Sequence, residues 1–133
     1  MRDEKSFGSF IREKRSRKNI SLRHLVELLD LSPVHMSNIE NDRRPAPKDE
    51  VLKRIIEVLQ LNKQEQEEMY ELAAKSKDIP TVPGDLPEYI SGNELARAAL
   101  RTAKDVDATD KEWLEFIEKL KKRSKREEKK NDL

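Results

Sequence analysis

A short helix predicted in the first third of the chain has an outer face whose side chains could contact nucleotide bases: Pro33, Val34, Ser37 and Asn38. Ser32 begins this helix, because a serine side chain caps free backbone N–H groups and proline is favoured at the first helical position. The amide of Asn38 can pair with N6 and N7 of adenine, and Val34 can contact a thymine methyl group. Ser37 can donate or accept a hydrogen bond, so it discriminates between bases less than Asn38 does. This face therefore offers contacts to base edges.

Residues beside this face could bind phosphate groups. Ser21 and Ser32 each precede a predicted helix, and the free N–H groups at a helix N-terminus attract anions. His35 is either a phosphate contact or a surface histidine lying beside a nucleic-acid backbone. Arg17 and Lys18 could add long-range attraction without specific contacts.

The composition argues against several other kinds of chemistry. The 133 residues include no cysteine, which excludes disulfides and thiolate metal sites. The histidines are His24 and His35, and the sequence has no glycine-rich phosphate loop, nucleophile–base arrangement or HExxH motif. We therefore expect no enzyme activity, no cofactor and no metal site. No apolar run approaches the roughly 18 residues of a membrane span, and no signal segment is seen, so we expect a cytoplasmic protein.

Charge is distributed unevenly, although the net charge is only +1. Residues 1–60 carry 13 Lys/Arg and 10 Asp/Glu, residues 61–120 carry 8 and 14, and residues 121–133 carry 7 and 3. This pattern favours a front surface that faces a polyanion and an acidic rear.

Every segment with regular hydrophobic spacing has the period of a helix, so we expect an all-α protein. Five helices are predicted within residues 1–76, at about 6–18, 21–29, 33–41, 48–60 and 63–76. The last of them begins at a capping box formed by Asn62 and Glu65. Residues 77–87 hold three prolines and a glycine, which indicates a linker or an ordered loop.

Two further helices are predicted within residues 88–122. Two sequence patterns typical of capping boxes, Ser91 with Glu94 and Thr109 with Glu112, indicate where they begin. The charged tail, residues 123–133, is too polar to pack, and we expect it to be disordered or a frayed helix end.

Residues of the second and third predicted helices, and of the loop that follows them, form a pattern: Ser21, Leu25, Leu29, Leu31, Ser32, Met36, Ser37, Ile39, Glu40, Asn41, Arg43 and Pro45. This order and spacing resemble the helix-turn-helix of Cro/CI-type repressors, the xenobiotic-response-element family. The resemblance covers residues 1–76 and implies a five-helix, lambda-repressor-like domain that inserts its third helix into the DNA major groove. It also implies phosphate contacts from Asn41, Arg43 and Arg44, although Arg44 could instead reach a base.

The resemblance implies one structural ion pair as well. An arginine of the first helix commonly pairs with a glutamate late in the third helix in this family, and Arg15 and Glu40 match those positions. Its implied role is to orient the third helix. Four residues depart from the family pattern: Leu22 for a phosphate-contacting glutamine, Val26 for alanine, Asp30 for glycine in the turn, and Lys48 at a capping position. Aspartate tolerates the left-handed conformation, so the turn should survive.

The C-terminal helix pair, residues 88–122, has an apolar, aromatic-rich face of the kind that anchors protein interfaces: Leu95, Ala99, Trp113, Phe116, Ile117 and Leu120. The pair loosely resembles the C-terminal helices of Sin-type repressors, which implies contact with a second copy or with an antirepressor. Alternatively, this face packs against the chain's own first domain.

These features predict a sequence-specific DNA-binding transcriptional regulator. The leading form is a dimeric repressor of bacterial or phage origin that binds a palindromic operator in double-stranded DNA. The alternative is an antitoxin or antirepressor-controlled switch. Its C-terminal helices would bind a toxin, antirepressor or peptidase, and its DNA binding would serve autoregulation.

Overall fold

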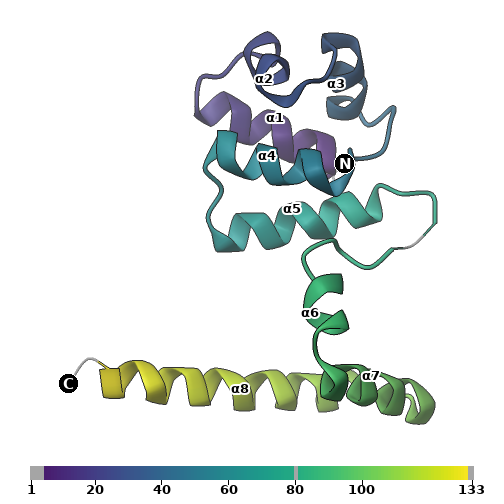
Figure 1. The fold of residues 1–133 in the computed structure, drawn as a ribbon, viewed down its shortest axis with the longest axis vertical. Helices are drawn as coiled ribbons and strands as arrows, with labels where there is room; N and C mark the ends of the chain where they lie inside the picture. The colour runs from purple at the N-terminus through teal and green to yellow at the C-terminus, as the bar shows by residue number, and fades with distance from the viewer. Residues whose placement is uncertain (1–4, 80, 132–133) are drawn as a thin grey trace. The chain divides into compact units, whose positions relative to one another are not determined.

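The computed structural model describes residues 5–79 and 81–131, and all regular secondary structure in this part of the chain is α-helical (Figure 1). The helices are α1 (Phe7–Arg17), α2 (Leu22–Leu29), α3 (Pro33–Glu40), α4 (Asp49–Leu59), α5 (Lys63–Lys75), α6 (Pro87–Ser91), α7 (Glu94–Val106) and α8 (Asp110–Asn131). The all-α prediction is confirmed. The chain divides into an N-terminal unit, Met1–Tyr89, and a C-terminal unit, Ile90–Leu133. None of the helices described has both the length and the apolar character that crossing a membrane requires.

The N-terminal unit contains the five predicted helices, each within a residue of its predicted bounds. Helix α1 packs against α3 and α5, and α2 packs against α3 and α4, so that α2 and α3 lie together at one end of the unit (Figure 1). Apolar residues recurring every three or four positions bring one face of each helix into a common core. Its fully buried side chains are Phe10, Ile11, Leu25, Leu29, Met36, Ile39, Ile55, Leu59 and Met69.

The turn between α2 and α3 forms as its residue types predict. Asp30 adopts the left-handed conformation with a φ of 58°. The Ser32 side chain then accepts a hydrogen bond from the His35 N–H at 3.0 Å, and Pro33 is the first residue of α3. Lys48, at the start of α4, makes no side-chain capping bond, as expected. Short-range chemistry therefore sets both ends of the turn that presents α3.

The predicted capping box at the start of α5 also forms. Asn62 Oδ1 accepts the Glu65 N–H at 2.8 Å, and Glu65 Oε1 accepts the Asn62 N–H at 2.9 Å. The second carboxylate oxygen of Glu65 lies 3.0 Å from Lys14 Nζ on α1. The backbone N–H of Asn62, followed by Lys14, lowers the pKa of Glu65, so this carboxylate remains ionised and joins α5 to α1.

The described residues of the segment 77–87, which the sequence left open as a linker or an ordered loop, group with the N-terminal unit. Lys77 Nζ donates to the Ala46 carbonyl at 2.6 Å, and Ser76 Oγ accepts the Ala46 N–H at 2.8 Å. Further along, Gly84 lies against the carboxylate of Asp49. These contacts attach the described part of this segment to the helices before it.

In the C-terminal unit, no described side chain is buried. The capping box predicted at Ser91 and Glu94 is wrong, because Ser91 ends the short helix α6, and α7 begins after Asn93, whose Oδ1 accepts the Ala96 N–H at 2.9 Å. The box predicted at Thr109 does form. Glu112 Oε1 accepts the Thr109 N–H at 3.0 Å, and Thr109 Oγ1 accepts the Glu112 N–H at 3.2 Å.

Helix α8 continues through Asn131, so residues 123–131 of the charged tail, which we expected to be disordered or a frayed helix end, are helical in the structure. Lysine, arginine and glutamate are good helix formers even without an apolar face. One pair of opposite charges four residues apart, Arg123 and Glu127, lies at 3.8 Å and adds weak support. Residues 132–133 of the predicted tail lie outside the described residues.

Candidate nucleic-acid interface

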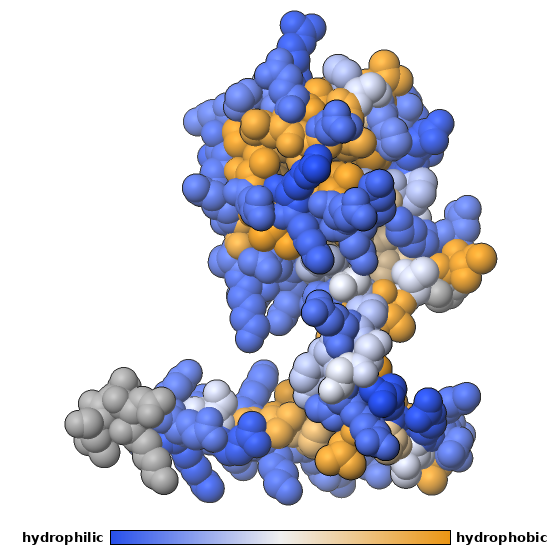
Figure 2. Space-filling view, viewed as in Figure 1, coloured by the Kyte–Doolittle hydropathy of each residue, from blue (hydrophilic) through white to orange (hydrophobic). Residues whose placement is uncertain are grey.

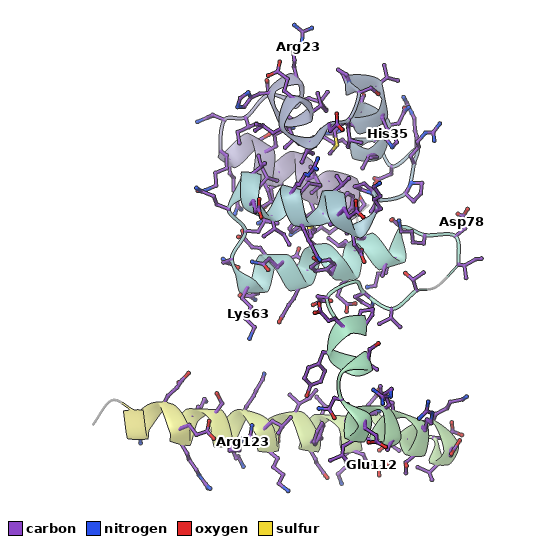
Figure 3. The ribbon with its side chains drawn as sticks, in the orientation of Figure 1. Arg23, His35, Lys63, Asp78, Glu112 and Arg123 are labelled. Carbon is purple, nitrogen blue, oxygen red and sulfur yellow. The ribbon has the colours of Figure 1, made fainter. Side chains whose placement is uncertain are left out.

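Helix α3 places its four predicted base-contacting residues on one side. Pro33 and Val34 are exposed, Val34 by 72%, and Ser37 and Asn38 are half-buried. The opposite side of the helix is anchored, because the side chains of Met36 and Ile39 are almost fully buried in the core. His35 is also exposed, and Figure 3 shows it at the same end of the unit as Arg23 of α2, away from Lys63.

The ion pair between Arg15 and Glu40 joins α1 to the last residue of α3. Arg15 Nε and Nη2 each donate to one carboxylate oxygen of Glu40 at 2.9 Å, and Nη1 donates to the Ile20 carbonyl at 3.0 Å. The Glu40 side chain is only 3% exposed. The hydrogen bonds to Glu40 raise the pKa of Arg15, which stabilises the charged guanidinium. This two-bond geometry restricts rotation as well as distance between the two helices.

The side chain of Asn41, predicted to contact phosphate, is exposed and forms hydrogen bonds within the protein. Its Oδ1 accepts a hydrogen bond from Arg12 Nη2 at 2.6 Å, and its Nδ2 donates to the Ser37 carbonyl at 2.9 Å. Arg12, which sequence reasoning missed, also donates to the Glu40 carbonyl at 3.3 Å. The Nδ2 amide of Asn41 has two N–H groups, so it can donate to a phosphate while it keeps its bond to Ser37. Arg12, with a half-exposed side chain, adds a positive charge beside it.

A second connection between α1 and the end of α3 was also not predicted from the sequence. Asp42 adopts a left-handed conformation with a φ of 59°. Its Oδ2 accepts a hydrogen bond from Ser6 Oγ at 2.7 Å, and its Oδ1 accepts the Gly8 N–H at 3.2 Å. A Cβ atom on Gly8 would lie 2.5 Å from the Glu40 carbonyl oxygen. A glycine in the first turn of a predicted helix was the available signal, since such a residue usually marks a close backbone approach.

The loop after α3 presents positive charge. Arg43 and Arg44 are exposed, and neither guanidinium forms an ion pair or a hydrogen bond within the described part of the chain. Together with Lys5 and Lys75 they line a shallow depression between this loop and the end of α5. Lys75 extends the cationic surface beyond the residues that the sequence indicated, whereas Lys5 is paired with Glu68 at 2.6 Å.

The predicted serines lie at the starts of their helices, where their side-chain oxygens act as caps. Ser21 Oγ accepts the His24 N–H at 3.1 Å, in the same way that Ser32 caps α3. Because Pro33 has no N–H, α3 offers fewer free backbone donors to an anion than α2 does. Each hydroxyl hydrogen remains able to donate to a phosphate oxygen.

The six residues of the predicted C-terminal contact face are exposed or half-buried. Leu95 is 81% exposed and Phe116 is 52% exposed. Trp113 and Phe116 form an edge-to-face pair with ring centroids 6.3 Å apart. Figure 2 shows apolar side chains gathered along α7 and the first half of α8, on a unit with no core of its own.

The described residues hold no group of three His, Asp or Glu side chains placed to bind a metal ion. A family model described as a helix-turn-helix domain matches residues 6–69. No curated protein matches the sequence. A solved structure titled "SinR protein/SinI protein complex" is 19% identical with a TM-score of 0.42, and the alignment covers 90% of this chain and 98% of that one.

Proposed function

From the match of residues 6–69 to a helix-turn-helix domain, we propose that the chain is a sequence-specific transcriptional regulator of the Cro/CI type, acting as a dimeric repressor. Helix α3 enters the DNA major groove, where Val34, Ser37 and Asn38 contact base edges. Arg43 and Arg44, with hydroxyls at the starts of α2 and α3, contact the phosphates on either side.

The observation that carries this proposal is the combination of an outward polar face on α3 with fixed anchoring behind it. Buried Met36 and Ile39 hold the inner side of the helix, and the Arg15–Glu40 pair fixes its end. Base recognition needs this rigidity, because hydrogen bonds to bases discriminate only when donors and acceptors are held in position. Unpaired arginines beside the helix supply attraction for the phosphate backbone.

Selection of binding sites from random duplex DNA, repeated at several salt concentrations, tests the proposal. We expect a palindromic motif with half-sites about 34–36 Å apart and binding that weakens steeply as salt rises. Asn38→Ala should relax the preference at one base position, at a cost of about 1–3 kcal/mol on the selected site, and should leave non-specific affinity nearly unchanged. Gln64→Ala, which removes an amide from α5, is the control. The absence of any enriched motif at all salt concentrations would contradict the proposal.

We further propose that the apolar face of α7 and α8 binds a second copy of the chain. A unit without buried side chains cannot be stable alone, and two half-sites in DNA favour a two-fold symmetric protein. The double variant Trp113→Ala, Phe116→Ala should therefore sediment as a monomer at micromolar concentrations where the parent is a dimer.

The matched control is Lys111→Ala with Glu115→Ala, which changes two exposed residues on the opposite side of the same helix. It should sediment like the parent. If the Trp113 and Phe116 variant also sediments like the parent, this face does not form the dimer.

The exposed apolar face also supports a second candidate function. In it, the C-terminal helices bind a different protein, such as a toxin, an antirepressor or a peptidase, and DNA binding serves autoregulation. A chain that stays monomeric at concentrations where it binds DNA, and that selects a motif without two-fold symmetry, would favour this candidate over the dimeric repressor.

A further inference from the structure

The second half of α8 has a strongly basic side. Lys121, Lys125 and Lys129 are spaced four residues apart and therefore form one row along the helix, and Lys122 and Arg126 form an adjacent row. All five side chains are exposed. We call these residues the basic stripe. Successive cations in a row are separated by about 6 Å, since an α-helix rises 1.5 Å per residue.

One acidic side chain borders this stripe and another lies on the far side of the helix. Glu128 is three residues after Lys125 and therefore lies at the edge of its row, whereas Glu127 lies on the other side and is paired with Arg123 at 3.8 Å. The apolar face around Phe116 and Leu120 lies on that other side too, in the first half of the helix. A protein partner seated on the apolar face would therefore leave the basic stripe open to solvent.

We propose that the basic stripe is a second DNA-binding surface, which contacts the phosphate backbone without reading sequence. This inference rests on the proposed function, because it assigns the stripe to the same DNA that α3 reads. Lysines in one row repel one another, and a polyanion relieves this repulsion. Double-stranded DNA has one negative charge per about 1.7 Å of its axis, a density that no isolated acidic side chain matches.

The covalent link between the two units also favours DNA as the partner of the basic stripe. Once the N-terminal unit is bound to an operator, the C-terminal unit of that chain is confined nearby, which raises the effective concentration of phosphate around the stripe. An anionic membrane fits less well. A helix lying in a membrane interface needs apolar residues alongside its cations, and the sequence has none between Lys121 and Asn131.

The test compares the full chain with the variant Lys121→Gln, Lys125→Gln, Lys129→Gln. Glutamine has a helix propensity close to that of lysine, so α8 should remain folded by circular dichroism. We measure affinity for a duplex without an operator as a function of salt. The slope of log K against log salt should become shallower by about 2–3, because each lost phosphate contact removes about 0.9, and affinity at low salt should fall at least about tenfold.

Two matched variants isolate the stripe from charge in general. Lys53→Gln, Lys63→Gln, Lys104→Gln removes the same charge from exposed lysines elsewhere and should bind with a slope close to that of the parent. Replacing Lys121, Lys125 and Lys129 with arginine keeps the charge and should preserve the parental slope. The operator motif selected from random DNA should be the same for every variant.

The outcomes separate this inference from the proposed function. If the parent selects an operator but the stripe variant keeps the parental slope, only the inference is overturned. The inference is also overturned if the control variant loses as much salt dependence and affinity for DNA as the stripe variant does. The same holds if the stripe variant selects a different motif. It holds as well if the stripe variant loses binding to anionic vesicles or polyglutamate but not to DNA. A parent that selects no operator contradicts the proposed function.

Discussion

Replacing Glu40 with alanine is expected to destabilise the N-terminal unit by about 3–5 kcal/mol, because it leaves the guanidinium of Arg15 half-buried without its counter-charge. A change of 1 kcal/mol shifts the melting temperature of a domain of this size by about 4–8 °C, so the melting temperature should fall by more than about 12 °C. Operator affinity should fall as well, since α3 loses its fixed orientation. Thermal unfolding by circular dichroism and operator titration on the same samples measure both effects.

Glu27→Ala is the matched control, because the Glu27 carboxylate is 66% exposed beside His24. It should shift the melting temperature little. The double variant Arg15→Ala, Glu40→Ala should lose less stability than the two single variants together, because no charge is left unpaired. Lost operator affinity with an unchanged melting temperature in Glu40→Ala would instead make this carboxylate part of the DNA contact.

Replacing Gly8 with alanine is expected to displace the end of α3. The new Cβ would lie 2.5 Å from the Glu40 carbonyl and 2.6 Å from the Ile39 carbonyl, and neither backbone oxygen can rotate away. Overpacking of this kind costs about 1–3 kcal/mol, partly offset by about 1 kcal/mol of improved helix propensity. We therefore expect a modest loss of thermal stability and a larger proportional loss of operator affinity.

Gly84→Ala is the control for this variant. Its Cβ would lie 2.6 Å from Asp49 Oδ1, but a side-chain carboxylate can turn aside, so stability and affinity should both change little. A Gly8→Ala protein with a higher melting temperature and parental affinity would show that α1 and α3 can separate without affecting DNA recognition.

The parts of the fold that follow from short-range chemistry were predictable from the sequence. Asp30 in its turn, Ser32 with Pro33 at the start of α3, and the capping box of Asn62 all depend on residues within four positions. The error at Ser91 has the same origin, because both Ser91 and Asn93 have side chains that can cap a helix. Local patterns cannot choose between two such caps two residues apart.

The contacts that orient α3 were harder to predict from the sequence. The bonds from Asp42 to Ser6 and Gly8 span more than thirty residues of sequence, and nothing near Asp42 indicates which carboxylate will meet which N–H. For the same reason the hydrogen bond from Arg12 of α1 to the Asn41 amide oxygen could not be predicted. Arg15 and Glu40 could be paired in advance only through the family resemblance.

Because α1 is attached to the end of α3 at two places, the helix proposed to contact bases cannot be transferred to another protein without α1. A peptide or grafted segment running from Ser21 to Arg44 would keep every residue proposed to contact the bases. It would lose the guanidinium of Arg15 and the Ser6 and Gly8 donors that set its angle. Transplanting this specificity into another scaffold therefore requires carrying the first helix along with the second and third.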